Sequence, residues 1–282
     1  MSYRTVITAQ ELRAHLGSED WAVVDCRFAL DDTERGRRDY LQAHIPGAVY
    51  AHLDEDLCGS KIPGKTGRHP FPELGAFARR LSAWGIDSRT QAVAYDGASG
   101  SMAAARLWWM LQWAGHTQAA VLDGGWALWQ ESGLPSAGGA EFRRSRQFVP
   151  QEVREILATA DQVEAASGDP NYLILDARSG ARYRGEVEPI DPVAGHIPGA
   201  LSTPYEENLA GDGTLLPPDA LRRRFAELIK SVSPENVICY CGSGVTAAQN
   251  LLAIAHAGMG RGRLYAGSWS EWITRPERAV AR

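Results

Sequence analysis

Short apolar runs alternate with segments of helical periodicity along most of the chain. Runs of β-forming residues predict buried strands at 21–27, 91–95, 119–122 and 237–241. Apolar positions at helical spacing predict helices between them, at 73–84, 101–113 and from 247 onward. Strands that alternate with helices are typical of a parallel sheet covered on both faces. The pattern therefore predicts an α/β fold.

Local signals refine this picture at the first helix and in two loops. Thr8 and Glu11 form a capping box that predicts a short helix to about residue 16. The charged stretch 31–39 favours a loop, and so does the stretch 54–72, which is rich in glycine, proline and charge.

The same landmarks occur twice in the same order. The paired segments are 24–27 with 175–178, 44–48 with 196–200, 94–97 with 239–242, and 123–129 with 266–272. Nearly constant offsets between so many pairs predict a tandem duplication of one α/β domain. We expect a first domain at 1–135, a linker at 136–150 that is rich in glycine, serine and arginine, and a second domain at 151–282.

Cys241 stands where a predicted strand, a short loop and a helix start meet. Gly242 and Gly244 follow it directly. Backbone N–H groups of such a loop can point at one atom, and the helix end adds roughly half a positive charge. A thiol there should ionise more readily than a free cysteine, whose pKa is about 8.5. The local pattern leaves two interpretations open: a nucleophile, or a buried structural cysteine at a strand end.

The two copies differ at this position. Where the second copy has Cys241, the first has Asp96. A carboxylate cannot act as a thiol nucleophile. We therefore expect an inactive first copy and a functional site near Cys241, with the first domain as its other wall.

Composition excludes several classes of function. A net charge of −5 gives no reason to expect nucleic acid or an anionic membrane as a partner. No run reaches the ~20 apolar residues of a membrane-spanning helix, and the first residues lack the apolar core of a signal peptide. The four cysteines are too few for a disulfide framework, and no Cys-x-x-Cys pair is present. We expect a cytoplasmic, metal-free monomer without a cofactor.

Together these landmarks resemble the two-domain sulfurtransferases of the rhodanese superfamily. The resemblance rests on the repeated Asp-x-Arg and His-Ile-Pro-Gly-Ala segments, Arg182-Tyr183-Arg184-Gly185, the Cys241 loop and the segment 267–272. It covers essentially the whole chain. It implies two tandem domains, each a mainly parallel β-sheet flanked by helices, with catalysis in the second. It also implies a ping-pong cycle in which Cys241 takes up a sulfur atom as a persulfide and passes it to an acceptor.

The residues of the Cys241 loop indicate which sulfurtransferases of this family the chain resembles most. Cys-Gly-Ser-Gly-Val-Thr at 241–246 resembles the 3-mercaptopyruvate sulfurtransferases, whereas thiosulfate enzymes of this architecture more often have Cys-Arg-Lys-Gly-Val-Thr. Two cations suit a dianionic donor, and a neutral loop suits a monocarboxylate. By resemblance, Ser243 joins His69 and Asp54 in a serine-protease-like relay that assists proton transfer. Alternatively, Asp54 caps a turn and His69 is an exposed loop residue.

The resemblance also implies where the small anionic donor binds. The residues concerned are Arg182, Arg184, Gly242, Gly244, Val245 and Thr246. Arg182 matches the arginine that grips the donor's anionic group, which its guanidinium can do through two N–H bonds. A second arginine is expected after Glu188-Pro189, but the chain has Ile190 there. Either Arg184 or backbone N–H groups take its place, or thiosulfate is used as well.

Other classes of function fit less well. Phosphatases and arsenate reductases also place a thiolate in an anion-binding loop, but they need an arginine six residues after the cysteine, where this chain has Ala247. A non-catalytic sulfur-carrier or regulatory module is the remaining alternative, and the intact Cys241 loop and Arg182 argue against it. For the enzyme, the family suggests a thiol such as thioredoxin, or cyanide, as the acceptor.

Overall fold

The computed structural model describes residues 2–282 and divides into two compact units. The first contains the chain up to Gly59, Pro72–Val153 and Gly211–Thr214. The second contains Ser60–Phe71, Arg154–Ala210 and Leu215–Arg282. Each unit thus includes a short segment from the other repeat, which the sequence pattern did not indicate. The boundaries at 135 and 151 stay predictions.

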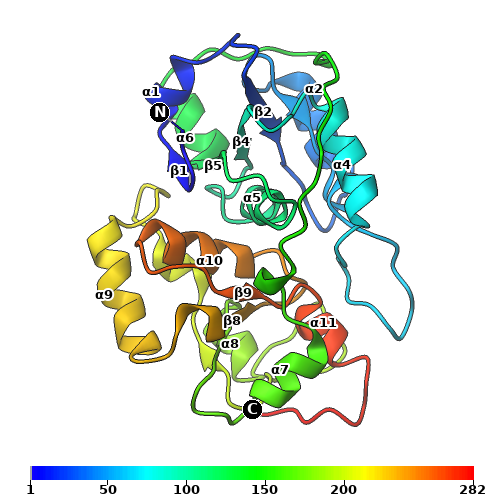
Figure 1. The fold of residues 1–282 in the computed structure, drawn as a ribbon, viewed down its shortest axis with the longest axis vertical. Helices are drawn as coiled ribbons and strands as arrows, with labels where there is room; N and C mark the ends of the chain where they lie inside the picture. Colours follow the sequence, from blue (N-terminus) through cyan, green and yellow to red (C-terminus); the bar gives the residue numbers. More distant parts are fainter. Residues whose placement is uncertain (1) are drawn as a thin grey trace. The chain divides into compact units, whose positions relative to one another are not determined.

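The first unit is a five-stranded parallel sheet with helices on it (Figure 1). The strands lie in the order β1-β5-β4-β2-β3. Its elements are β1 (Val6–Ile7), α1 (Ala9–Arg13), β2 (Trp21–Asp25), α2 (Arg35–Gln42), β3 (Val49–Tyr50), α3 (Leu53–Asp56), α4 (Leu74–Ala83), β4 (Gln91–Tyr95), α5 (Ala103–Trp113), β5 (Ala119–Leu122) and α6 (Gly125–Glu131).

The second unit is a four-stranded parallel sheet in the order β7-β6-β8-β9. A parallel bridge between Leu157 and Leu264 stands where β1 pairs with β5 in the first unit. Its elements are η1 (Arg154–Ile156), α7 (Ala160–Ala166), β6 (Leu173–Asp176), α8 (Gly180–Tyr183), β7 (Leu201–Ser202), η2 (Tyr205–Asn208), α9 (Pro218–Ile229), η3 (Pro234–Asn236), β8 (Val237–Tyr240), α10 (Ala247–His256), β9 (Arg263–Leu264) and α11 (Ser268–Trp272).

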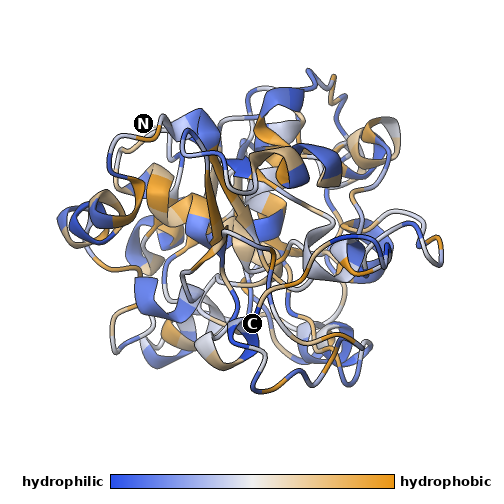
Figure 2. Ribbon diagram, turned by 90° about the horizontal axis from the view of Figure 1, so that it is seen from below, coloured by the Kyte–Doolittle hydropathy of each residue, from blue (hydrophilic) through white to orange (hydrophobic). Residues whose placement is uncertain are grey.

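The fold class predicted from the repeat is confirmed. Both sheets are parallel, and the central strands pair in the same register: Asp25 with Tyr95 between β2 and β4, and Asp176 with Tyr240 between β6 and β8. Figure 2 shows hydrophobic residues along the strands and both kinds of residue on the helices. One face of each sheet packs against an early helix and a tryptophan-bearing helix, α1 with α6 and α7 with α11.

One predicted loop is wrong. The charged stretch 31–39 was expected to be irregular, but α2 (Arg35–Gln42) begins within it. Only Gly36 and Tyr40 of this helix are buried, so its apolar positions are too few to show a period. Ion pairs between residues one turn apart, such as Arg35 with Asp39, support the exposed face.

A buried ion pair fastens the end of the central strand in both units. The carboxylate of Asp25 accepts bonds from the Arg27 guanidinium and from the Tyr95 hydroxyl, and Arg27 also donates to the Ala43 carbonyl. Asp176 and Arg178 repeat the arrangement in the second unit. The arginine of each pair thus links the end of β2 or β6 to a backbone carbonyl later in the chain, that of Ala43 or Gly195.

Replacing Asp25 with alanine should lower the free energy of unfolding by about 3–5 kcal/mol, because the buried Arg27 guanidinium would lose its counter-charge. Urea unfolding followed by circular dichroism measures this. The exposed Asp31→Ala is the matched control and should change stability by less than about 0.5 kcal/mol. Equal stability of the two variants would contradict a supporting role for the pair.

Candidate active site

The loop that carries Cys241 begins at the carboxyl end of β8 and leads into α10. Cys241 is 2% exposed. Gly244 has a φ of 73°, and a Cβ on it would lie 2.3 Å from the Ala266 carbonyl oxygen, so the turn requires glycine there. Ligands of open parallel sheets bind at this end of the strands, so the position suits a functional residue.

The start of α11 fixes the same loop from the other side. The Cys241 N–H donates to the Ser268 hydroxyl, with N and Oγ 3.1 Å apart. The N–H groups of Trp269 and Ser270 donate to the carbonyls of Cys241 and Gly242 at 3.0 and 2.9 Å. These bonds hold the shape of the loop.

The loop lowers the pKa of the Cys241 thiol. Burial alone would raise this pKa. The Thr246 hydroxyl and the N–H groups of Ser243, Ala247 and Val245 bond to the sulfur, however, and together they bring the pKa below its ordinary value. Cys239, two residues earlier in β8, lacks such donors, and burial raises its pKa well above the ordinary value. Cys241 is therefore the thiol that is prepared to ionise.

His69 and Ser243 meet beside this thiol. Nδ1 of His69 lies 2.8 Å from the Ser243 hydroxyl oxygen, and both side chains are buried. The contact lies within the second unit, because Ser60–Phe71 packs there rather than with the rest of the first repeat. The Arg68 N–H donates to the Ser270 hydroxyl at 3.0 Å and anchors this segment next to α11.

The remaining predicted residues occupy different settings. Asp54 lies in α3 of the first unit, where its N–H donates to Nδ1 of His52, and its part in a relay stays a prediction. Arg182 lies in α8 and bonds both carboxylate oxygens of Glu188, through Nε at 3.1 Å and Nη2 at 2.6 Å. Arg184 is exposed and forms the same kind of bidentate ion pair with Glu186. Val245 and Thr246 lie in the Cys241 loop.

A model of the rhodanese-like domain matches residues 8–132 and again 159–275. The chain belongs to the rhodanese family. The resemblance seen in the sequence is thereby confirmed.

Full-length relatives of this rhodanese chain are sulfurtransferases. It is 47% identical to the probable 3-mercaptopyruvate sulfurtransferase of Pseudomonas aeruginosa, over 100% of this chain and 99% of the relative. It is 33% identical to the mitochondrial thiosulfate/3-mercaptopyruvate sulfurtransferase 1 of Arabidopsis thaliana, over 96% and 76%. The crystal structure of the 3-mercaptopyruvate sulfotransferase SseA of Escherichia coli matches with a TM-score of 0.80 at 33% identity, over 95% and 100%.

The first rhodanese domain has an equivalent loop, in which the carboxylate of Asp96 takes the place of the Cys241 thiol. The carboxylate of Asp96 accepts bonds from the N–H groups of Ala98, Gly100 and Met102, at 2.8, 2.9 and 3.0 Å. These are the second, fourth and sixth residues after Asp96, and the donors to Cys241 are the second, fourth and sixth residues after it. The side chain of Asp96 thus occupies the donors that in the second domain serve the sulfur.

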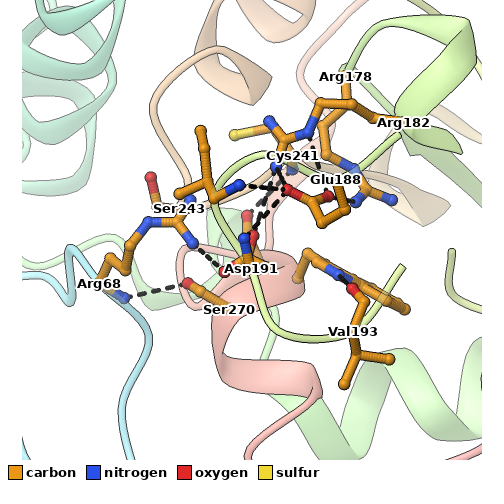
Figure 3. A network of polar contacts seen from close by, with 12 residues as sticks. Arg68, Arg178, Arg182, Glu188, Asp191, Val193, Cys241, Ser243 and Ser270 are labelled. Carbon is orange, nitrogen blue, oxygen red and sulfur yellow. Dashed lines mark hydrogen bonds and ion pairs between the residues drawn. The ribbon is translucent and has the colours of Figure 1, made fainter. Parts of the chain in front are cut away.

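Sequence reasoning missed the residues that surround Arg182. Arg68 is paired with Asp191, and Asp191 also contacts Arg182, with Nη2 and Oδ2 3.4 Å apart (Figure 3). The Glu188 carboxylate accepts hydrogen bonds from the N–H groups of Ile190 and Asp191, and these bonds fix the turn that carries Asp191. The sequence signal that could have indicated this cluster of Arg68, Arg182, Glu188 and Asp191 is the basic residue directly before His69.

One group among residues 2–282 could bring three metal-binding side chains together: Glu34, His52 and Glu55. Nδ1 of His52 accepts N–H groups from the backbone, so Nε2 carries the proton and donates to the Thr33 carbonyl at 3.0 Å. With both ring nitrogens engaged, this cluster does not offer a metal ligand set. Within the same residues no helix is long and apolar enough to cross a membrane.

Replacing Thr246 with valine should raise the pKa of Cys241, because it removes one of the groups that stabilise the thiolate. The rate of Cys241 alkylation by iodoacetamide should then fall at neutral pH and stay unchanged at high pH, so its midpoint moves upward. Mass spectrometry of the Cys241 peptide gives the rate at each pH. Thr117→Val, at an exposed site, is the control. An unmoved midpoint in Thr246→Val would refute the assigned bond.

Proposed function

We propose that the protein is a sulfurtransferase that moves a sulfur atom from 3-mercaptopyruvate through a persulfide on Cys241 to a thiol or cyanide. The observation that carries this proposal is the Cys241 loop, which stabilises a thiolate and has the Ser243–His69 pair beside it. The names of the full-length relatives support the same activity. A neutral Gly-Ser loop suits a monocarboxylate donor.

The first half-reaction follows from this geometry. The Cys241 thiolate attacks the donor's sulfur, an S–S bond forms and the donor's C–S bond breaks. The electron pair of that bond goes to the carbon, which leaves as the enolate of pyruvate and takes up a proton. Cys241 then carries the persulfide, and the same backbone N–H groups that lower the thiol pKa can stabilise the charge on it.

Ser243 and His69 act on protons in this step. The hydroxyl stands within hydrogen-bond reach of the imidazole, so a proton can pass between the donor and the ring through it. Asp54 would orient the ring, as the resemblance implies. Gly242, Gly244 and Val245 shape the loop around the reacting sulfur.

In the second half-reaction an acceptor takes the outer sulfur of the persulfide. A thiolate or cyanide attacks that sulfur, the S–S bond breaks, and its electron pair returns to Cys241 as thiolate. Cyanide would give thiocyanate, and a dithiol such as thioredoxin would release the sulfur as sulfide after forming its own disulfide. Thioredoxin as acceptor, a monomeric state and a cytoplasmic location stay predictions.

Thiosulfate is the second candidate donor. The persulfide cycle is the same, with sulfite as the leaving group. The relative from Arabidopsis thaliana that is named for both donors favours this candidate.

Changing Ser243 to alanine should lower kcat with mercaptopyruvate by about 100-fold, as expected for the loss of assisted proton transfer. Turnover of thiosulfate, which needs no such proton, should change less than about 3-fold. Steady-state assays with cyanide as acceptor measure both, and wild-type kcat/KM should favour mercaptopyruvate. Ser231→Ala, at an exposed site, is the control. Mercaptopyruvate turnover that survives Ser243→Ala would exclude the relay. A wild-type kcat/KM that favours thiosulfate would make thiosulfate, and not mercaptopyruvate, the preferred donor.

A further inference from the structure

The first residue of α11 has a backbone conformation that serine rarely adopts. Ser268 has a φ of 54°, which lies in the left-handed region. This region is unfavourable for any residue with a Cβ atom. Ser268 is also fully buried. Strained residues of this kind persist only where the surrounding structure holds them, and they are most frequent at functional sites.

The equivalent turn of the first domain has a glycine in this place. Gly125 matches Ser268 in the repeat and has nearly the same φ, 57°. The tryptophan after Gly125 donates its N–H to the carbonyl of Asp96 at 2.9 Å, and the tryptophan after Ser268 donates to the carbonyl of Cys241 at 3.0 Å. The two turns are therefore built alike, and glycine, which adopts a positive φ readily, satisfies the turn in the domain without the cysteine.

Serine adds to this turn a hydroxyl group that connects two segments of the site. The Ser268 hydroxyl accepts the N–H of Cys241, with N and Oγ 3.1 Å apart, and donates to the Tyr265 carbonyl at 2.9 Å. The N–H of Tyr265 donates in turn to the Cys239 carbonyl at 3.0 Å, which fixes Tyr265 against β8. The hydroxyl is thus held in place and restrains the peptide group between Tyr240 and Cys241.

The orientation of this peptide group decides where the sulfur of Cys241 lies. The peptide is planar, so a rotation of its N–H changes the φ of Cys241 and swings the Cα–Cβ bond that carries the sulfur. Hydrogen bonds weaken steeply when their geometry is lost. A small rotation would therefore cost the sulfur its bonds while its burial remained. The donors of those bonds belong to Ser243, Val245, Thr246 and Ala247.

We propose that Ser268 is a positioning residue whose hydroxyl holds Cys241 so that the sulfur stays among its hydrogen-bond donors. The second domain keeps a strained serine in this turn because glycine, which fits the backbone, supplies no hydroxyl. The kinetic consequence rests on the proposed function, whereas the position of the sulfur does not. The alternative is that the hydroxyl only adds to the stability of the fold.

Two variants of the full chain, Ser268→Gly and Ser268→Ala, separate these roles. Both lack the hydroxyl, but only glycine relieves the backbone, so Ser268→Gly should unfold at a higher urea concentration than Ser268→Ala. The pH midpoint of Cys241 alkylation by iodoacetamide should nevertheless rise in both by about one pH unit, a tenfold change in the ionisation equilibrium. Ser231→Gly, at an exposed site, is the matched control and should leave the midpoint unchanged.

Steady-state assays of the same variants should show a fall in kcat with mercaptopyruvate of about 10-fold, the loss expected for about one hydrogen bond. KM should change less than about 2-fold, because the O–H of Ser268 is already donated to Tyr265 and is not available to the sulfur donor.

Alkylation needs no sulfur donor, so it tests the positioning role apart from the proposed function. An alkylation midpoint of Ser268→Gly equal to that of the wild type overturns the inference. So does a midpoint that rises in Ser268→Ala and not in Ser268→Gly, because reactivity would then follow stability and not the hydroxyl. Raised midpoints in both variants, together with a wild type that transfers no sulfur from mercaptopyruvate, would refute the proposed function and support the role of Ser268.

Discussion

The functional loop depends on a competition between burial and hydrogen bonding at one sulfur atom. Burial works against a thiolate, as the raised pKa of Cys239 shows for a thiol in the same strand. At Cys241 three backbone N–H groups and one hydroxyl reverse the outcome. The donors point inward because Gly244 turns the chain through a positive φ and because α11 takes up the backbone groups of Cys241 and Gly242. The strand end, the glycine turn and the two helices are needed together.

In the first domain the equivalent loop uses the same backbone hydrogen bonds to hold a carboxylate instead of a thiol. Both loops present N–H groups from the second, fourth and sixth residues, and both sit at the end of the second central strand. In the first domain the carboxylate of Asp96 uses those donors, and in the second they serve a sulfur that can gain and lose another atom. One backbone arrangement thus provides a structural anchor in one copy and a candidate reaction centre in the other.

Much of this could be predicted from the sequence because it depends on local patterns and on repetition. The strands at 91–95 and 119–122 were predicted to the residue, since buried parallel strands leave continuous apolar runs. The position of Cys241 at a strand end followed from the same signal. Helix α2 was missed because only Gly36 and Tyr40 of it are buried, so its sequence has no apolar period.

The rest could not be predicted because it depends on which distant segments pack together. Nothing local to residues 60–71 indicates that this segment joins the second unit and brings His69 to Ser243. For the same reason Arg68 was not among the predicted site residues, although it lies beside one that was. The Asp191 carboxylate that links Arg68 with Arg182 becomes visible only when residues 123 positions apart in the chain are brought together.

The central claim is that Cys241 carries the transferred sulfur. The most direct measurement is mass spectrometry of the protein after brief exposure to mercaptopyruvate, with the modified peptide identified and with Cys241→Ser treated in parallel. The account predicts that the peptide with Cys241 gains the mass of one sulfur atom, that cyanide removes this mass and that Cys241→Ser gains none. A wild-type protein that gains no mass, or gains it on Cys26, Cys58 or Cys239 instead, would contradict the account.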